Sequence, residues 1–412
     1  MTPEVKQRIE QIQQGIVLKG YKKTKTDIVP ADWKESPIGE YIREYTEKTT
    51  IPNQYPVLTS ARTGLMLQTD YYSNRQVTTE DNVGYNILPY GYITFRSRSD
   101  DGRFRFNENR IIERGVISYF YPVFSFSEEV CHEYMLYLLN FSIYRRMYPY
   151  AEGTAQQVLS LKKLGQLKYS LPLVAEQKKI AEILATQDKA IELQGRKIEE
   201  LKRFKKGCLE KMFPRKGQKV PEKRFPGFTD DWEQRKFEEI AVRSSVICSD
   251  DTLPRVEYED IVSGTGRLNK DIYAKQSIKS GIAFHQGDVL YGKLRPYLQN
   301  WLLPTFDGLA VGDFWVLQPQ NADSSFLYRL IQSRQFNEVA NQSTGTKMPR
   351  ADWKLVCKTV FSIPSNISEQ AAIGTYFTAL DSLITLHQRK LEEMKRQKKA
   401  LMQLLLTGIV RI

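Results

Sequence analysis

Cysteine and histidine are scarce in this chain of 412 residues, which contains four cysteines and three histidines. The cysteines (Cys131, Cys208, Cys248 and Cys357) lie far apart, so we expect neither a CxxC metal knuckle nor a disulfide framework. The histidines fall in three different segments, and none has a neighbour at metal-ligand spacing. The sequence therefore predicts no metal site.

Long hydrophobic runs are also missing. No stretch of 18 apolar residues occurs, which argues against a membrane-spanning helix. The first residues, MTPEVKQRIEQIQQG, are charged and lack the continuous apolar segment of a secretory signal. We therefore expect a soluble, cytoplasmic protein.

Positive charge is in excess. The chain has 60 Lys and Arg against 48 Asp and Glu, a formal net charge of +12. Such a balance suits a protein that meets a polyanion, although charge alone is only modest support for nucleic-acid binding. The length predicts two or three domains, each with enough chain to bury a core.

The second half of the chain repeats the first. EQKKIAEILATQDKAIELQ from Glu176 corresponds without a gap to EQAAIGTYFTALDSLITLH from Glu369, at an offset of 193 residues. The repeat extends upstream, because Asp32-Trp33 recurs as Asp231-Trp232 and GYITF at Gly91 recurs as GDVLY at Gly287. A repeat of this length predicts two copies of one structural unit.

Each copy consists of a variable block followed by a long helix. The blocks are rich in Tyr, Phe, Val and Ile with Gly, Asn and Asp between them, a composition typical of short strands, and 131–146 and 325–342 have the pattern of amphipathic helices. We predict an α+β fold with a pseudo-two-fold internal repeat and two long antiparallel helices forming a coiled coil. The expected parts are an N-terminal helix and lead-in (1–26), a first mixed block (27–170), a first long helix (171–213), a linker (214–228), a second mixed block (229–362) and a second long helix (363–412).

The long helices carry apolar residues at alternating spacings of four and three, which indicates coiled-coil seams. The principal seam positions are Ile180, Leu184, Ile191, Ile198, Leu201, Ile373, Phe377, Ile384, Leu391 and Met394. Each helix of 37 residues, from 176 and from 369, would span about 56 Å. If the two helices pair within one molecule they must run antiparallel and act as a spacer between the blocks. The alternative is that they join two copies of the chain.

Several segments resemble the specificity subunit of type I restriction-modification systems, and the resemblance covers essentially the whole chain. The segments are LPLVAEQKKIAEIL from Leu171, RFPGFTDDWEQRKF from Arg224, SGTGRL from Ser263, GDVLYGKLRPYLQN from Gly287, TGTKMPRADW from Thr344 and IPSNISEQAAIGTYF from Ile363. The first block departs from this pattern, because GYITFRSRSDDGRFRF stands where the second block has GDVLYGKLRP.

The resemblance implies a division of labour. Each block would be a target recognition domain that reads one half of a bipartite, interrupted double-stranded DNA target. The helices would set the spacer and dock two modification (methyltransferase) subunits, to which restriction (motor and nuclease) subunits would bind. The chain itself would be non-catalytic and bind no cofactor, while S-adenosylmethionine, ATP and Mg²⁺ would belong to the partner subunits.

Basic and hydroxyl residues in loops are the candidate DNA contacts. Arginines at alternate positions of 96–105 would share one face of a hairpin, and GKLRP and TGTKMPR place cations at a strand end and in a loop. The candidates are Arg62, Arg96, Arg98, Arg103, Arg105, Thr154, Lys293, Arg295, Thr346, Lys347 and Arg350. Solvated loops are the alternative reading of these segments.

Two further features stay open. The lysine runs KRFKK (202–206) and KRQKK (395–399) fit docking of partner subunits better than DNA, and the tyrosines and phenylalanines of 119–124 fit strand packing better than base stacking. No methyltransferase motif is present, and GDVLYGK (287–293) is rejected as a phosphate-binding loop because Leu294 replaces the metal-binding Ser or Thr. A protein-interaction scaffold with two heads, without DNA readout, remains the alternative function.

Overall fold

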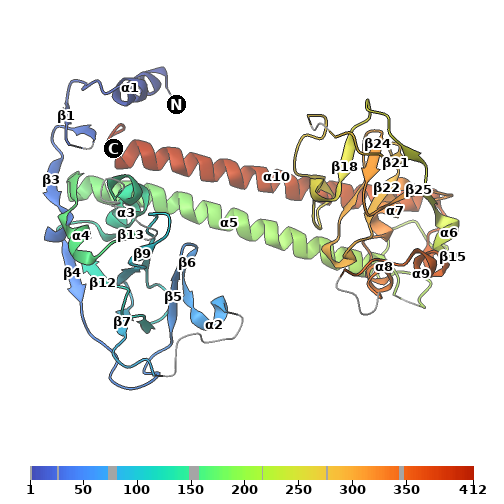
Figure 1. Ribbon diagram of the computed structural model, residues 1–412, viewed down its shortest axis with the longest axis horizontal. Coiled ribbons are helices and arrows are strands. Elements are labelled where there is room, and N and C mark those ends of the chain that lie inside the picture. The colour runs from blue at the N-terminus through green and yellow to red at the C-terminus, as the bar shows by residue number, and fades with distance from the viewer. Residues whose placement is uncertain are drawn as a thin grey trace. The chain divides into compact units, whose positions relative to one another are not determined.

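The computed structural model describes residues 2–25, 27–72, 81–147, 157–215, 217–274, 277–342 and 348–412. The chain divides into two compact units (Figure 1). Unit 1 comprises residues 1–192 and 392–412, and unit 2 comprises residues 193–391. Helices α5 (Val174–Met212) and α10 (Ile367–Leu406) each contribute one part to both units. The predicted α+β class with two long helices is confirmed.

A four-stranded antiparallel sheet forms the centre of unit 1. Its strands follow the order β10-β8-β12-β4. Their bounds are β4 (Ile42–Tyr45), β8 (Ile93–Phe95), β10 (Phe106–Glu108) and β12 (Val123–Phe126). The rings of Phe95, Phe106 and Phe124 are fully buried between this sheet and helix α3 (His132–Met147). The predicted helix over 131–146 and the predicted GYITF strand are therefore both present.

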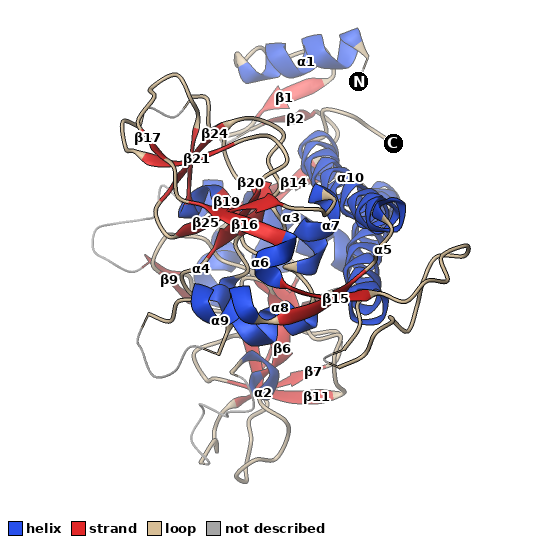
Figure 2. Ribbon diagram, turned by 90° about the vertical axis from the view of Figure 1, so that its right-hand side faces the viewer, coloured by secondary structure: helices blue, strands red, loops and turns tan. Residues whose placement is uncertain are grey.

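Pairs of short strands and short helices complete unit 1 (Figure 2). The strand pairs are β1 (Tyr21–Lys23) with β2 (Ile28–Pro30), β3 (Lys34–Pro37) with β14 (Lys168–Leu171), β5 (Leu58–Ala61) with β6 (Gly64–Leu67), β7 (Asn86–Pro89) with β11 (Arg114–Ile117), and β9 (Arg98–Ser99) with β13 (Gln157–Val158). The helices are α1 (Pro3–Gln13), α2 (Gln68–Tyr71) and α4 (Leu161–Gln166).

Unit 2 has a sheet of the same design. Its order, β16-β25-β22-β23, matches β4-β12-β8-β10 of unit 1, with the predicted GDVLY strand in the place of GYITF. A second four-stranded sheet, β17-β21-β24-β18, exists in unit 2, and its β18 and β24 are parallel. The bounds are β16 (Ala241–Ser244), β17 (Ile247–Cys248), β18 (Arg255–Glu257), β21 (Gly281–Phe284), β22 (Val289–Gly292), β23 (Trp301–Leu302), β24 (Gly308–Val311) and β25 (Phe314–Pro319).

The other strand pairs and α-helices that the structure describes in unit 2 are all short. They are β15 (Glu233–Lys236) with β26 (Val360–Ile363), β19 (Ile261–Val262) with β20 (Arg267–Leu268), and helices α6 (Phe237–Ile240), α7 (Ser324–Leu330), α8 (Arg334–Ala340) and α9 (Trp353–Lys358). The single helix predicted over 325–342 is wrong. The side chain of Ser333 accepts a hydrogen bond from the Phe336 N–H and so begins a new helix, α8.

Each long helix is joined to the mixed block that precedes it in the same way. The strand after the Asp-Trp pair (β3 or β15) is antiparallel to the strand before the long helix (β14 or β26). At the first turn of the helix, the buried amides of Gln177 and Gln370 each donate to a proline carbonyl oxygen, that of Pro172 or Pro364, at 2.9 and 2.8 Å. Each amide oxygen also accepts a backbone N–H at 2.8 Å, from Cys131 at α3 or from Asp323 at the α7 N-cap.

A glutamate beside each glutamine binds an arginine. Glu369, 1% exposed, accepts two hydrogen bonds from Arg224 at 2.6 and 2.7 Å and one from the Trp232 indole at 3.2 Å. Glu176 accepts two from Arg411 at 2.6 and 2.7 Å. In both cases the hydrogen bonds to the glutamate raise the pKa of the arginine.

Arg224 lies in the predicted linker (214–228), which is largely exposed but packs at a few points. Phe213 and Pro214 are buried, and the ring of Phe225 contacts that of Tyr376. In unit 1 the C-terminal tail takes the same position. Arg411 binds Asp32 as well as Glu176, and the Tyr21 hydroxyl donates to the carbonyl oxygen of Gly408.

The long helices pair antiparallel within each unit. In unit 1 the Asp188 carboxylate contacts Lys398 at 2.5 Å, and in unit 2 Asp381 contacts Lys205 at 2.6 Å. These two pairs occupy equivalent positions of the repeat. Unit 2 also contains a hydrogen bond of 2.8 Å between Gln194 and His387. Such polar contacts in an apolar seam fix the register of two helices at some cost in stability.

The predicted N-terminal helix forms over Pro3–Gln13, but it ends before Ile16. Its apolar residues Val5, Ile9 and Ile12 are only partly buried. The guanidinium of Arg8 donates to the Ile409 carbonyl oxygen at 3.0 Å. This helix therefore contacts the C-terminal tail.

Replacing Glu369 by Ala should lower the free energy of unfolding by about 3–5 kcal/mol, because Arg224 and the Trp232 N–H lose a buried acceptor. Urea denaturation followed by circular dichroism measures this. Glu392→Ala is the control, since Glu392 pairs with Lys395 at the surface and should contribute less than about 1 kcal/mol. Equal losses for the two variants would contradict a structural role for Glu369.

Candidate nucleic-acid interface

Two of the predicted basic segments meet in unit 2. The turn after β22 and the segment before α9 form backbone hydrogen bonds, from the Arg295 N–H to the Pro349 carbonyl oxygen at 2.7 Å and from the Ala351 N–H to that of Lys293 at 2.9 Å. Leu294 and Arg350 form an isolated β-bridge between them. GKLRP and the described end of TGTKMPR, residues 348–350, therefore lie in one site.

Asp313 holds the two cations of this site together. Arg350 donates from Nε and Nη2 at 3.3 and 3.1 Å, and the Lys293 ammonium lies 3.6 Å from the same carboxylate. The hydrogen bonds from Arg350, with the charges of Arg350 and Lys293, lower the pKa of Asp313 despite its partial burial. The carboxylate therefore stays ionised at neutral pH and orients both cations.

The backbone that follows Lys293 is strained. Arg295 and Gln299 have φ values of +48° and +57° and flank a single 3₁₀ turn, Pro296–Leu298. The buried Nε of Arg295 has no hydrogen-bond partner among the described residues, while Tyr297 at the turn is 58% exposed. Left-handed conformations in non-glycine residues cost about 1–3 kcal/mol each and cluster at binding sites. The positive φ values, with the exposed ring of Tyr297, mark this turn as a candidate contact segment.

The corresponding site of unit 1 is the loop that joins β8 to β10. Strands β8 and β10 are antiparallel and pair through Phe95 and Phe106, so the segment between them is the loop of a hairpin, as predicted. Within this loop, however, β9 pairs with β13. The arginines of this loop and of the neighbouring β5–β6 turn are all exposed: Arg62, Arg96, Arg98, Arg103 and Arg105. Buried Ser99 and Phe104 alternate with them, as the period-two pattern predicts.

Asp101 organises part of this loop, as Asp313 does in unit 2. Its Oδ1 accepts hydrogen bonds from Arg62 at 2.7 Å, from the Ser99 hydroxyl at 2.9 Å and from the Arg103 N–H at 3.2 Å. Arg98 lies over the ring of Phe120, 5.3 Å from its centroid. Arg96, Arg103 and Arg105 are also exposed.

Two exposed aromatic residues belong to the unit 1 site and were assigned to strand packing by the sequence pattern. Tyr119 and Phe120 are 54% and 47% exposed, with ring centroids 4.0 Å apart. They lie in the turn between β11 and β12, where the Tyr121 N–H donates to the Ser118 carbonyl oxygen. Strand packing is correct for Val123 and Phe124, which are buried. Exposed aromatic rings beside arginines suit stacking on bases.

The other predicted residues fall elsewhere. Thr154, Thr346 and Lys347 lie outside the described residues.

The predicted seam residues of the long helices lie inside the units. Ile180 and Leu184 are buried in unit 1 against Leu405, while Ile198, Ile373, Phe377 and Ile384 are buried in unit 2, and Ile191, Leu201, Leu391 and Met394 are partly buried. GDVLYGK contains strand β22, as expected for a segment that is not a phosphate-binding loop.

Over the described ranges no group of three or more His, Cys, Asp or Glu residues is arranged to hold a metal ion. Within the same ranges, none of the helices has both the length and the apolar character needed to cross a membrane.

Comparison with known proteins identifies the class to which these units belong. Residues 30–203 and 229–396 each match the family model described as the type I restriction modification DNA specificity domain. The chain belongs to this family, and it contains two copies of the family's domain.

Named relatives agree. The chain is similar to the type I restriction enzyme MjaVIII specificity subunit of Methanocaldococcus jannaschii, with 25% identity over 63% of this chain and 66% of the relative. It is also similar to the EcoDI specificity subunit of Escherichia coli, with 23% identity over 79% of this chain and 76% of the relative. The chain is thus similar to specificity subunits of type I restriction enzymes.

Solved structures support the fold. A chain from a structural study of complex assembly and conformational transition of the type I R-M system has a TM-score of 0.58 at 14% identity, covering 93% of this chain and 99% of that one. The type I restriction-modification system S subunit from M. genitalium has a TM-score of 0.54 at 14% identity, covering 93% and 97%.

Asp313→Asn should reduce discrimination between target and non-target duplexes by about tenfold, because Lys293 and Arg350 lose the carboxylate that orients them. Non-specific affinity should rise slightly, since one negative charge near the phosphates is removed. Fluorescence anisotropy at fixed salt measures both quantities. Unchanged discrimination would show that the pairing has no part in readout.

The carboxylate of Asp313 also sets the pH range over which its ion pairs with Lys293 and Arg350 persist. Because the folded-state pKa of Asp313 lies below its ordinary value near 4, its ion pairs should persist at neutral pH and be lost only as the pH falls through that lowered value.

Proposed function

We propose that this chain is the DNA-binding specificity subunit of a type I restriction-modification enzyme and recognises a bipartite, interrupted target in double-stranded DNA. One observation carries the proposal. The two units share a sheet order and the attachment of a long helix, but they present different sets of exposed cations and aromatic rings. Two readers of different chemistry on one framework suit a target with two unlike halves.

Unit 2 would read its half-site with Lys293, Arg295 and Arg350, and unit 1 would read the other half with Arg96, Arg98 and Phe120. Arginine is the commonest side chain that recognises guanine in a bidentate manner, and lysine more often neutralises phosphate. The antiparallel helices α5 and α10 would fix the spacing between the half-sites.

The chain would be non-catalytic and act in the cytoplasm as part of an assembly. It would position two modification subunits, which methylate adenine after flipping it from the duplex, and would bind restriction subunits through that core. S-adenosylmethionine, ATP and Mg²⁺ would be held by those partners and not by this chain.

The two units should contribute separately to the target. Arg98→Gln should weaken discrimination within one half of the target, and Arg350→Gln within the other, each by about 1–3 kcal/mol or 5- to 150-fold, if these side chains contact base edges. Binding to duplexes with single base changes, carried out on the assembled methyltransferase, measures both. The assignment would fail if either variant relaxed both halves equally.

The long helices should determine the spacer. Inserting seven residues after Glu192 and seven after Leu391 preserves the heptad phase of both helices and lengthens the pair by about 10.5 Å, or about three base pairs. Methylome sequencing of a host that carries the variant should show the same two half-sites with a longer gap.

Insertion of seven residues into α5 alone, which disturbs the pairing of the helices, is the control and should abolish methylation. An unchanged gap in the matched variant would contradict the spacer, and the absence of a split motif with the original chain would favour an interaction scaffold.

A further inference from the structure

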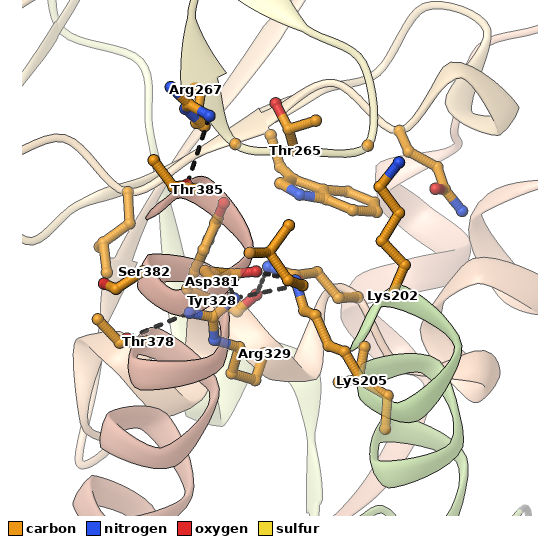
Figure 3. Close-up of a pocket in the computed structure, with 18 of the residues that line it drawn as sticks. Lys202, Lys205, Thr265, Arg267, Tyr328, Arg329, Thr378, Asp381, Ser382 and Thr385 are labelled. Atoms are coloured by element: carbon orange, nitrogen blue, oxygen red, sulfur yellow. Dashed lines mark hydrogen bonds and ion pairs between the residues drawn. The ribbon is translucent and has the colours of Figure 1, made fainter. Parts of the chain in front are cut away.

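Two sequence motifs that the proposed readout does not use meet in one cavity of unit 2. The loop SGTGRL (263–268) lies opposite the lysine run of α5, and the N-terminal part of α10 forms a third side (Figure 3). The cavity has a volume of about 1100 Å³. Resting on the proposed function, we propose that this cavity binds phosphates of the DNA backbone and so contributes affinity without sequence preference.

At the floor of the cavity two cations share one carboxylate. Asp381 accepts hydrogen bonds from Lys205 at 2.6 Å and from Arg329 at 2.7 Å, and the Thr378 hydroxyl accepts another from Arg329 at 3.1 Å (Figure 3). Arg329 is 2% exposed, and its Nε has no hydrogen-bond partner among the described residues. The floor therefore holds its cations firmly, and the contacts to a ligand must come from the exposed cations around it.

The mouth of the cavity carries positive charge that is less compensated. Lys206, Arg267 and Arg389 line it and are exposed, and within the described ranges none of them forms an ion pair. Lys202 also lines it and pairs with Glu199 at the surface. Arg267 instead donates to the Thr385 hydroxyl and to the Gln388 side chain, at 3.3 and 3.1 Å. Cations spread around a mouth fit a strand that lies across it better than a single small anion inside it.

Glycine brings the SGTGRL loop close to the cavity. Gly264 and Gly266 have φ values of +70° and +66°, and a Cβ atom on Gly266 would lie 1.7 Å from the Tyr328 hydroxyl oxygen. Only glycine therefore allows this loop to approach Tyr328 and place Thr265 and Arg267 at the cavity. The glycines thus serve the position of the loop.

The composition of the cavity favours phosphate over an acidic protein surface. Lysine is depleted at protein interfaces, where exposed aromatic residues usually anchor the contact. Here the aromatic residues Trp301 and Tyr328 are both 5% exposed, so they cannot anchor a partner. Lysine, arginine and hydroxyl groups together are the usual ligands of DNA phosphates.

The repeat provides a matched control. Lys202 and Lys206 of α5 correspond at an offset of 193 to Lys395 and Lys399 of α10 in unit 1. Lys202 pairs with Glu199, and Lys395 with Glu392, both at 2.8 Å. The variants Lys202→Gln/Lys206→Gln and Lys395→Gln/Lys399→Gln therefore remove the same charge from equivalent helical positions, but only the first pair lines this cavity.

The test measures how affinity of the assembled methyltransferase for duplex DNA depends on salt. Each phosphate contact contributes about −0.9 to the slope of log K against log salt concentration. Lys202→Gln/Lys206→Gln should reduce the slope by about 2, equally for target and non-target DNA, and leave the methylated motif unchanged, and adding Arg267→Gln should reduce it by about 1 more. Lys395→Gln/Lys399→Gln should leave the slope nearly unchanged.

Three results would overturn the proposal while the proposed function stands: an unchanged slope, an equal effect of the control pair, or loss of assembly with the modification subunits at an unchanged slope. The last would assign the cavity to partner docking. Competition with ATP provides a further measurement. If the substitutions weaken ATP binding and leave DNA binding unchanged, the cavity is a site for a free nucleotide. If the original complex binds no duplex DNA, the proposed function itself fails.

Discussion

The attachment of each recognition block to its long helix is the constraint on which the rest of the structure depends. In unit 2, Glu369 and Gln370 are almost completely buried, and they bind Arg224, Trp232, Pro364 and the N-cap of α7 within one helical turn. Buried polar groups of this kind are costly unless every partner is present, so the geometry is sharply defined. The strands and loops that carry the candidate contacts are therefore built on a fixed base.

Unit 1 achieves the same attachment with chain ends. Glu176 and Gln177 take the positions of Glu369 and Gln370, and Arg411 of the C-terminal tail takes the position that Arg224 has in the segment between the copies. Gly408, at φ +71°, ends α10 and lets the tail pack against Pro30 and Trp33. The arginine that binds the buried glutamate thus comes from the segment between the two copies in unit 2 and from the segment after α10 in unit 1.

Much of this was predictable because it depends on local periodicity and on the repeat. The heptad pattern predicts long helices over the segments that contain α5 and α10, and the offset of 193 predicts that the two helices have equivalent positions, which the ion pairs of Asp188 and Asp381 occupy. The antiparallel direction follows if the helices pair within one chain.

Contacts between distant segments were not predictable. No local pattern shows that Leu294 pairs with Arg350, that Asp313 binds the cations beside them, or that SGTGRL lies opposite Lys202. Apolar composition also misassigned Tyr119 and Phe120 to a strand, because a turn at Ser118 interrupts the alternation. Side chains at such turns are placed by tertiary packing, which a single sequence reveals only when a motif is already familiar.

The central claim is that two unlike readers on one chain contact one duplex at a fixed separation. Hydroxyl-radical footprinting of the assembled methyltransferase on its target, repeated at several salt concentrations, tests it most directly. The account predicts two protected patches about one helical turn apart, both weakened together as salt rises. A single continuous patch, or protection that is insensitive to salt, would contradict it.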